Sequence, residues 1–309
     1  MTGASREPLV SIGVPVRNGS AALARALESL VTQTYRHLEI IISDNASTDA
    51  TPDICRQFAA RDSRISYVRH EVPLTAFQNF RFTFDAARAS YFMWAAYDDL
   101  RSPNYVEVLL AGMMRSPDAS LCFSDVQEFG DLDDMSTATS IAHDFATGGL
   151  SFRDRIRKQT SLGCVHVYGL VNAAYLKEYA WYDLQDGPDA ALLFYLAERG
   201  RFVYEPGATF YYHRPHGRDA EARARATTYR RLEPFHQERL AWYSALGVEH
   251  ARRRRPVTVP RLHTLAVLYY HIIQGPKGLV YAWLPPFVRS AWRRMRSRRL
   301  DLTSKNARC

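Results

Sequence analysis

Residues 40–49 of the chain read IIISDNASTD, and residues 91–100 read YFMWAAYDDL. Each stretch is an apolar run, too short for a buried helix, that ends abruptly in carboxylates; this is typical of a buried strand followed by a loop. In an open α/β sheet, ligands bind in the crevice at the carboxyl ends of the strands. Two such strands ending in acids predict a site for a nucleotide and its metal-bound diphosphate.

The sequence around these two stretches alternates between strand and helix patterns. Strands are expected at 9–16, 38–43, 65–68, 91–96 and 119–126. The helices between them are expected to begin near Ser20, near Ser47 or Asp49, at Thr75 and at Pro103. Alternation at this pace predicts an α/β fold with a mostly parallel sheet flanked by helices.

The pattern changes after residue 126. Residues 129–149 combine acids, Ser/Thr-rich sequence and two glycines, which predicts a mobile loop or an irregular excursion. Strands are expected around 165–171 and 202–212, on either side of a helix at 189–199 that Gly200 ends. Residues 218–243 are polar with a helical pattern.

The basic residues are concentrated at the C-terminal end. The 309-residue chain has a formal net charge of +8, but residues 251–309 contain fourteen Arg or Lys and one acid, so they carry +13 and the rest carries −5. The length suits one large α/β domain plus an appendage. The cysteines, Cys55, Cys122, Cys164 and Cys309, have no metal-ligand spacing, which favours reduced thiols in a cytoplasmic protein.

The motifs resemble those of the family 2 glycosyltransferases. Residues 10–19 read VSIGVPVRNG, and together with residues 43–49 and 94–100 they follow the family's order and spacing. The resemblance implies a GT-A type, Rossmann-like fold and inverting transfer of a sugar from a nucleotide-diphosphate sugar, UDP-linked, to a hydroxyl acceptor in surface polysaccharide or glycolipid assembly. It places a glycosyltransferase domain at 8–217, with a nucleotide-binding half at 8–124 and an acceptor half at 125–217, followed by a helical basic extension at 218–309.

The resemblance assigns the nucleotide site to residues that follow the first strands. Asp44 is expected to accept the imide N–H of uracil, and Asn45 stands where the family usually carries a second Asp. The other residues assigned to the nucleotide are Pro15, Arg17, Asn18, Gln78, Asn79 and Asp98. The alternatives are that the loop at Asp44 only begins the next helix and that the polar residues at 78–79 only solvate a helix surface.

Asp98 and Asp99 are the expected ligands of a divalent metal, Mn²⁺ or Mg²⁺. Such cations prefer oxygen ligands and bridge phosphate oxygens. The family's motif is Asp-x-Asp, and here Ala96 replaces the leading Asp, which leaves one carboxylate fewer. The alternative is a solvated acidic turn before the next helix.

Asp189 is the expected general base. The segment 186–192 resembles the family's segment in which an acid begins the helix behind the acceptor, and a carboxylate there takes the proton of the attacking hydroxyl. One base without a nucleophilic partner fits a single displacement with inversion. Asp186 is the competing assignment, because Pro188 stands where the family often has Glu; helix-start acids favoured by the dipole are the structural alternative.

Three further residues are expected near the diphosphate. His213, Arg214 and His216 follow the last strand of the core, where the resemblance places phosphate contacts. Surface polar residues on a closing loop are the alternative.

The basic C-terminal segment suits an anionic membrane surface. Its Arg clusters flank aromatic residues such as Trp283, Phe287 and Trp292, and each cation near such a surface contributes about 1 kcal/mol. We therefore expect a peripheral protein on the inner face of the membrane, with a glycan or lipid-linked acceptor. A helical subdomain packed on the core is the alternative; nucleic acid binding has no supporting module.

Other function classes lack their motifs. A sugar-nucleotide pyrophosphorylase needs a Gly-rich loop after the first strand, where this chain has one glycine, Gly19, and no Gly-x-Gly-x-x-Gly follows a strand, as a dinucleotide-dependent oxidoreductase requires. A non-catalytic sugar-nucleotide-binding or membrane scaffold protein with a degenerate site stays the alternative to an active transferase, because of Ala96.

Overall fold

The computed structural model describes residues 7–214, except residues 133, 142–144, 152–153, 156–157, 159–163, 180 and 182–187. In the following list η marks a short 3-10 helix. The elements follow one another in this order: β1 (Val10–Val16), α1 (Leu23–Val31), β2 (Leu38–Asp44), α2 (Thr51–Arg61), β3 (Ile65–Arg69), α3 (Ala76–Asp85), β4 (Tyr91–Trp94), β5 (Leu100–Arg101), α4 (Tyr105–Arg115), β6 (Ala119–Phe129), η1 (Met135–Thr137), β7 (Thr139–Ile141), η2 (Val165–Tyr168), β8 (Leu170–Asn172), α6 (Ala173–Glu178), α7 (Pro188–Arg199) and β9 (Arg201–His213).

The strands of the described residues form one nine-stranded sheet with the order β3-β2-β1-β4-β8-β6-β9-β5, and β7 pairs with β6 outside this path. β3, β2, β1 and β4 are parallel, as the alternating sequence predicts. The second half is mixed, because the short strand β8 runs antiparallel to both β4 and β6, while β6 and β9 are parallel. The result is the expected α/β fold, in which the strands of the first half are all parallel and those of the second half are mixed.

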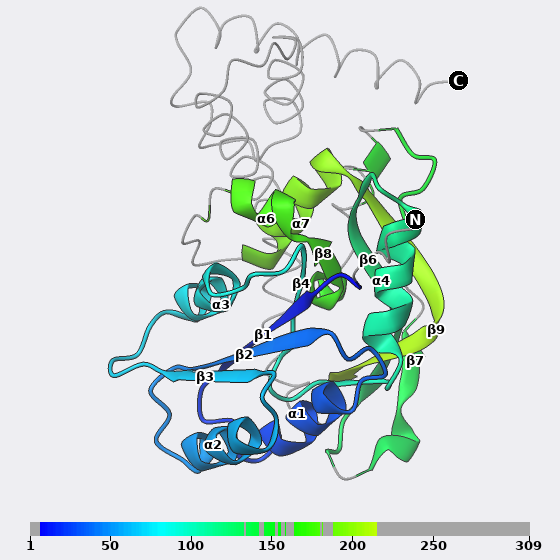
Figure 1. Cartoon of the computed structure of the whole chain (residues 1–309). Helices are drawn as coiled ribbons and strands as arrows, with labels where there is room; N and C mark the ends of the chain where they lie inside the picture. Colours follow the sequence, from blue (N-terminus) through cyan, green and yellow to red (C-terminus); the bar gives the residue numbers. More distant parts are fainter. Residues whose placement is uncertain are drawn as a thin grey trace, which may run out of the picture.

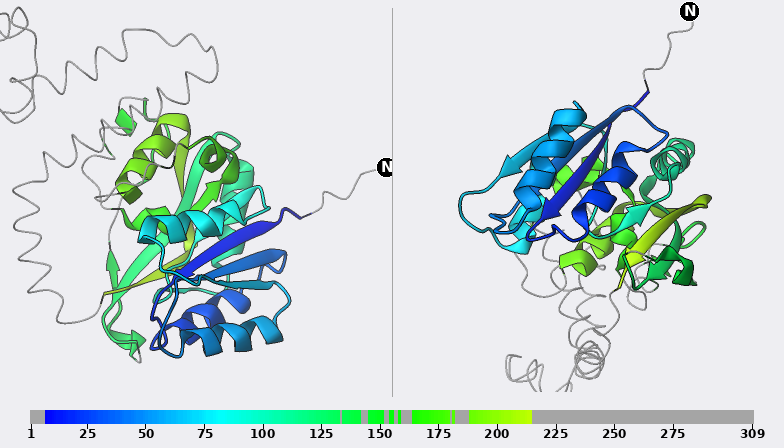
Figure 2. Two further views of the ribbon diagram at one scale, coloured as in Figure 1. Left: turned by 90° about the vertical axis from the view of Figure 1, so that its left-hand side faces the viewer. Right: turned by 90° about the horizontal axis from the view of Figure 1, so that it is seen from below.

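Helices cover both faces of the sheet (Figures 1 and 2). Val10, Ile12 and Val14 of β1 point to one face and pack in one cluster with the apolar sides of α1, α2 and α4. Phe92 and Trp94 of β4 point to the other face and pack with α3, α6 and α7. Because side chains alternate along a strand, β4 supplies both cores, with Met93 in the first cluster and Phe92 and Trp94 in the second, which explains its continuous apolar run.

Several expectations about local structure are wrong. Ser20 does not cap α1; its backbone N–H donates to the carboxylate of Asp49 instead. The expected strand at 165–171 is a 3-10 turn, η2, followed by the short β8, since Gly169 breaks the apolar run. Residues 129–149 are not simply irregular, because η1 and β7 lie within them and β7 pairs with β6. The sequence reading also missed β5 and α6.

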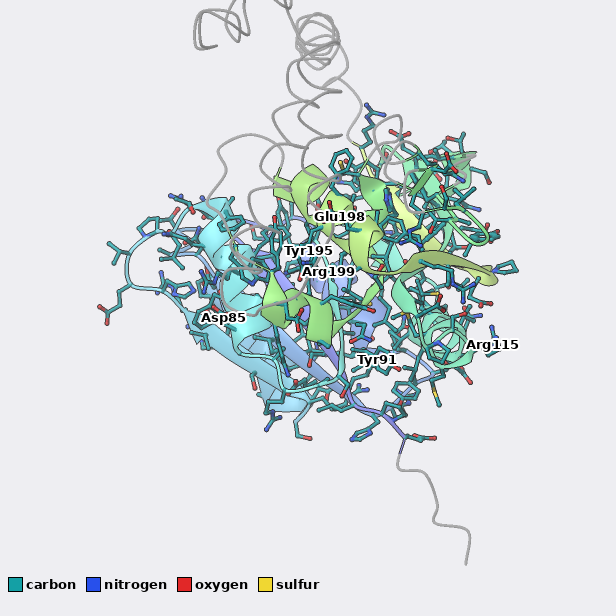
Figure 3. The ribbon with its side chains drawn as sticks, turned by 90° about the horizontal axis from the view of Figure 1, so that it is seen from above. Asp85, Tyr91, Arg115, Tyr195, Glu198 and Arg199 are labelled. Atoms are coloured by element: carbon teal, nitrogen blue, oxygen red, sulfur yellow. The ribbon has the colours of Figure 1, made fainter. Side chains whose placement is uncertain are left out.

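The second half of the domain is fixed by aromatic contacts around α7. The guanidinium carbon of Arg199 lies 3.7 Å from the ring centroid of Tyr195, and the Tyr195 hydroxyl donates to the carbonyl of Tyr175 in α6. Figure 3 shows the side chains of Tyr195 and Arg199 close together on this helix. These contacts anchor the helix whose first turn carries Asp189.

No helix in the described part of the chain is both long and apolar enough to cross a lipid bilayer. Cys55 and Cys122 are buried and Cys164 is half-buried, and all three are free thiols. The helix expected at 218–243, the basic segment 251–309 and Cys309 lie outside the described residues.

At Gly13 of β1 the sheet packs tightly against α3. A Cβ atom at this position would lie 2.4 Å from Oγ1 of Thr83 and 2.8 Å from the ring of Phe92, both in the core. We therefore expect Gly13→Ala to lower the free energy of unfolding by about 1–3 kcal/mol through overpacking. Gly148→Ala is the matched control, because a Cβ there meets nothing within 4 Å. Urea unfolding of both variants tests this; equal stability of the two would contradict it.

Candidate functional site

The loops that follow β1 and β2 are tied together by side chains of the second loop. The backbone N–H groups of Asn18, Gly19 and Ser20 donate to Ser47, Thr51 and Asp49 at 2.9, 2.9 and 3.0 Å. In return, Asn18 Oδ1 accepts from the backbone of Thr48 at 2.8 Å. The polar residues of the stretch 47–51 therefore hold both loops in one shape at the carboxyl end of the sheet.

The two loops also contain residues in the left-handed backbone conformation and a carboxylate with a lowered pKa. Asn18 and Ala46 have φ of 50° and 54°, in the region that turns often use. Burial alone would raise the pKa of Asp49, but hydrogen bonds from Thr51 and Ser20 outweigh it and hold that pKa well below its usual range. Asp49 is therefore ionised at neutral pH and accepts hydrogen bonds from both loops.

Asp44 lies at the end of β2 with its carboxylate completely buried. Its Oδ1 accepts from the backbone of Ser47 at 2.9 Å, and its Oδ2 accepts from the Tyr67 hydroxyl at 2.9 Å. The Nε of Arg69 lies 3.5 Å from the same Oδ2, and the Arg69 side chain is 50% exposed. Nη2 of Arg69 also donates to the Ser47 carbonyl at 2.8 Å, so the backbone and side-chain contacts around Asp44 join β2, β3 and the loop after β2.

The other residues expected at the nucleotide have partners within the fold. Both ends of the Asn45 amide bond the backbone of Leu74, at 2.9 and 2.6 Å. Asn79 is buried and bonds the side chain and backbone of Ser43, at 2.6 and 3.1 Å, while Gln78 is exposed and forms a capping box with Thr75. Pro15 is buried within β1, and Arg17 is exposed directly after it. These contacts position α3 against β2, so several of the predicted residues shape the loops.

The loop after β4 brings two acids together with a residue from the far end of the domain. Asp99 is buried, and its Oδ1 accepts from the backbone N–H of His213 at 2.8 Å. Asp98 is 27% exposed, and its Oδ2 lies 3.4 Å from Nδ1 of His213. Arg214 instead binds Glu128 at 2.9 Å, and His216 lies outside the described residues. Of the three expected diphosphate residues, the structure therefore places His213 at the acids.

A buried arginine that the sequence analysis missed lies beside these acids. The Arg101 guanidinium lies 4.9 Å from the ring centroid of Phe210 and 5.8 Å from that of Tyr105, and its Nη2 donates to the Trp94 carbonyl at 2.9 Å. Burial lowers its pKa, and the charge of Asp99 opposes that effect. An arginine two residues after an acidic pair looks like an ordinary surface residue in sequence, so no local signal identified it.

Burial raises the pKa of Asp99 to about 7, although the His213 N–H and the charge of Arg101 both lower it. Within the described residues no group accepts or donates at Asp99 Oδ2, nor at Nε and Nη1 of Arg101. Buried polar atoms without a partner are costly, so these atoms fit a site that is completed by water or a ligand.

The acid pair fits a divalent cation only in part. The described residues contain no group of three His, Cys, Asp or Glu side chains that could hold a metal. Mg²⁺, however, is commonly bound by one or two carboxylates together with substrate phosphates and water. Asp98, which is partly exposed, and Oδ2 of Asp99, which has no partner among the described residues, fit this way of binding Mg²⁺.

Asp189 lies in the first turn of α7 with its side chain open to solvent. Protein atoms around it still displace enough water to raise its pKa above the usual value. Tyr168 links it to the acid pair, because this one phenol is close enough to interact with the charges of Asp189, Asp99 and Asp98. The competing acid, Asp186, lies outside the described residues.

The family profile and the similar proteins all point to glycosyltransferases. The sequence profile of the family described as "Glycosyl transferase family 2" matches residues 11–180, more than half of the chain. Two proteins of Streptococcus pneumoniae serotype 4 (strain ATCC BAA-334 / TIGR4) are similar. Glycosyltransferase GlyA is 35% identical over 101 residues (32% of this chain, 14% of GlyA), and Glycosyltransferase GlyG is 26% identical over 151 residues (49% of this chain, 50% of GlyG). The chain thus spans at most half the length of these relatives.

Solved structures share the fold. The crystal structure of S. aureus TarS 1–349 in complex with UDP-GlcNAc superposes with a TM-score of 0.60 at 12% identity, over 86% of this chain and 72% of that one. The complex of the same protein with UDP gives 0.57 at 12% identity, over 92% and 77%. This likeness confirms the expected GT-A type fold. With the match of more than half of the chain to the family profile, it follows that the protein belongs to glycosyl transferase family 2.

Proposed function

We propose that the protein is an inverting glycosyltransferase that moves a sugar from a UDP-sugar to a hydroxyl acceptor. The observation that carries the proposal is that the short turn η2, which ends at Tyr168, contacts both β4, which leads into Asp98 and Asp99, and α7, which carries Asp189 in its first turn. A transferase needs this separation of roles, with one group of acids at the leaving diphosphate and one at the attacking hydroxyl. Membership of the family and the likeness to a protein solved with UDP-GlcNAc support it.

In this proposal the two halves of the domain divide the substrates. The loops after β1 and β2, with Asp44, hold the nucleotide, and His213 lies beside the acids that face the diphosphate. Asp98 and Asp99 would hold Mn²⁺ or Mg²⁺, which when bound neutralises the charge of the leaving diphosphate. Arg101 keeps a fixed positive charge next to Asp99 and so limits the repulsion between two neighbouring carboxylates.

Asp189 acts as the general base. Its carboxylate takes the proton of the acceptor hydroxyl while the acceptor oxygen bonds the anomeric carbon and the bond from that carbon to the diphosphate breaks. One displacement of this kind inverts the anomeric configuration. The raised pKa of Asp189 strengthens it as a base, because a carboxylate that is harder to ionise binds a proton more readily.

The acceptor that we propose is a glycan or a lipid-linked glycan in surface polysaccharide assembly. The argument rests on the +13 charge of residues 251–309, which suits an anionic membrane surface where lipid-linked acceptors are found. These residues lie outside the described part of the chain, so the peripheral membrane contact is a proposal from sequence alone.

For the nucleotide, we expect Asp44→Ala to weaken UDP binding by about 1.5–3 kcal/mol, because it removes a charge-assisted hydrogen bond to the base. Asn45→Ala, whose amide bonds the backbone of Leu74, should have a much smaller effect. Calorimetric titration of UDP measures both, with thermal unfolding as the check on folding. Equal UDP affinity in the wild type and Asp44→Ala would remove Asp44 from the base site.

For the metal, we expect EDTA to abolish the release of UDP from UDP-GlcNAc or another UDP-sugar, and added Mn²⁺ to restore it. Asp98→Asn and Asp99→Asn should each lose this activity while the protein stays folded. Asp85→Asn is the matched control, because Asp85 lies on the surface of α3 in an ion pair with Arg81 (Figure 3). Full activity in chelator would contradict the metal, whereas a folded protein that releases no UDP with Mn²⁺ would favour the non-catalytic alternative.

For the base, Asp189→Asn keeps the size of the side chain but cannot take a proton. We expect it to lower the rate of transfer by about 10²–10⁴-fold, with UDP binding unchanged. Asp186→Asn should have a much smaller effect. Single-turnover transfer rates separate the two residues, and the opposite ranking would move the role to Asp186.

A further inference from the structure

Tyr168 ends η2, a short turn that lies between the two groups of acids. This turn contacts β4, which leads into the acid pair, and also α7, which carries Asp189 in its first turn. β8 follows the turn almost directly and pairs with both β4 and β6, so the position of Tyr168 is fixed by the sheet. The sequence analysis gave this residue no role.

The ring and the hydroxyl of Tyr168 have different surroundings. The half-buried ring lies 5.6 Å, centroid to centroid, from Phe210, whose other contacts include the guanidinium of Arg101. Burial raises the pKa of the Tyr168 hydroxyl well above its usual value, and the charges of Asp189, Asp99 and Asp98 add to this effect. Among the residues that the structure describes, no group accepts a hydrogen bond from this hydroxyl. The packed ring therefore carries a protonated O–H group on a turn that contacts both β4 and α7, within electrostatic range of three carboxylates.

We propose that the hydroxyl of Tyr168 bonds a hydroxyl group of the donor sugar and thereby helps to select that sugar. The inference rests on the proposed function. If the acid pair faces the diphosphate and Asp189 faces the acceptor, the transferred sugar lies between them, and Tyr168 lies between them too. A neutral donor suits this place, because it bonds a sugar hydroxyl without adding charge beside the carboxylates.

A site that hydrogen-bonds a substrate hydroxyl discriminates against an analogue that lacks it. This gives Tyr168 a signature that a packing role does not share. Tyr168→Phe keeps the ring against Phe210 and removes only the O–H group. If the hydroxyl bonds one sugar hydroxyl, removing either of the two groups should lower kcat/KM by about the same factor. Removing both should lower kcat/KM little further.

The experiment uses the full-length protein and measures kcat/KM for UDP release from UDP-GlcNAc, UDP-glucose and UDP-galactose. The preferred donor is then compared with its deoxy analogues, each lacking one sugar hydroxyl. We expect the wild type to disfavour one analogue by about 2- to 10-fold, the range of a single neutral hydrogen bond. Tyr168→Phe should lose about the same factor on the parent donor, and should use that analogue and the parent equally well. UDP affinity should not change.

Tyr204→Phe is the matched control, because its exposed hydroxyl bonds Asp125 at 2.5 Å; it should keep the wild-type ratios. If Tyr168→Phe keeps the wild-type ratio for every deoxy analogue, the inference is wrong even though the enzyme is active, and any loss of melting temperature then reports a packing role. A fall in UDP affinity equal to the loss of kcat/KM would move the hydroxyl to the nucleotide and also overturn it. If the wild type releases UDP from none of the three donors, the proposed function itself fails, and the sugar contact with it.

Discussion

The hydrogen bond from the backbone of His213 to the buried carboxylate of Asp99 joins the two halves of this domain at its site. Asp99 follows the last parallel strand of the nucleotide-binding half, and His213 ends β9. The same region pairs β5 with β9, so the backbone and one carboxylate fix the loop together. The link therefore adds a side-chain contact at the acids to the strand pairings, β4 with β8 and β5 with β9, that already hold the second half of the sheet beside them.

Burying a carboxylate is unfavourable, and the structure around Asp99 shows how that cost is limited. Arg101 lies buried between aromatic rings on the next short strand and supplies a compensating charge, while His213 supplies a hydrogen bond. The compensation is incomplete, since Asp99 Oδ2 has no partner within the described residues. Incomplete satisfaction of a buried charge is expected where a ligand, rather than the fold, provides the remaining contact.

The loops after β1 and β2 differ from the loop at Asp99, because their buried polar side chains have partners within the fold. Asp44, Asn45 and Asn79 are buried and hydrogen-bonded, and they hold the loops after β1 and β2 and the start of α3 in place. Preformed loops lower the entropy that binding must overcome, which would benefit the nucleotide site that we propose here. The Arg69 side chain, which is half exposed, lies over this arrangement, with its Nε 3.5 Å from Asp44 Oδ2 and its Nη2 bonded to the Ser47 carbonyl.

Local sequence patterns are sufficient to predict the parallel half of the sheet, the acids at the carboxyl ends of its strands and the family. Long apolar runs such as 38–43 and 119–126 have few alternatives to a buried strand, and a run that ends in acids marks where a strand leaves the core. The sequence also indicated a helix at 189–199, ended by Gly200, and the structure has α7 there with Asp189 in its first turn.

Which of these residues meet depends on the pairing of strands that are distant in sequence. His213 reaches Asp99 across more than a hundred residues, Arg101 is buried because β9 and α4 cover it, and Tyr168 lies near acids from both halves because β8 pairs with β4. A single tyrosine or arginine carries no local pattern, and its neighbours are fixed by strand pairing between distant segments. That is why local sequence predicted the elements and most of the acids, while the burial, charge and mutual approach of the site residues required the fold.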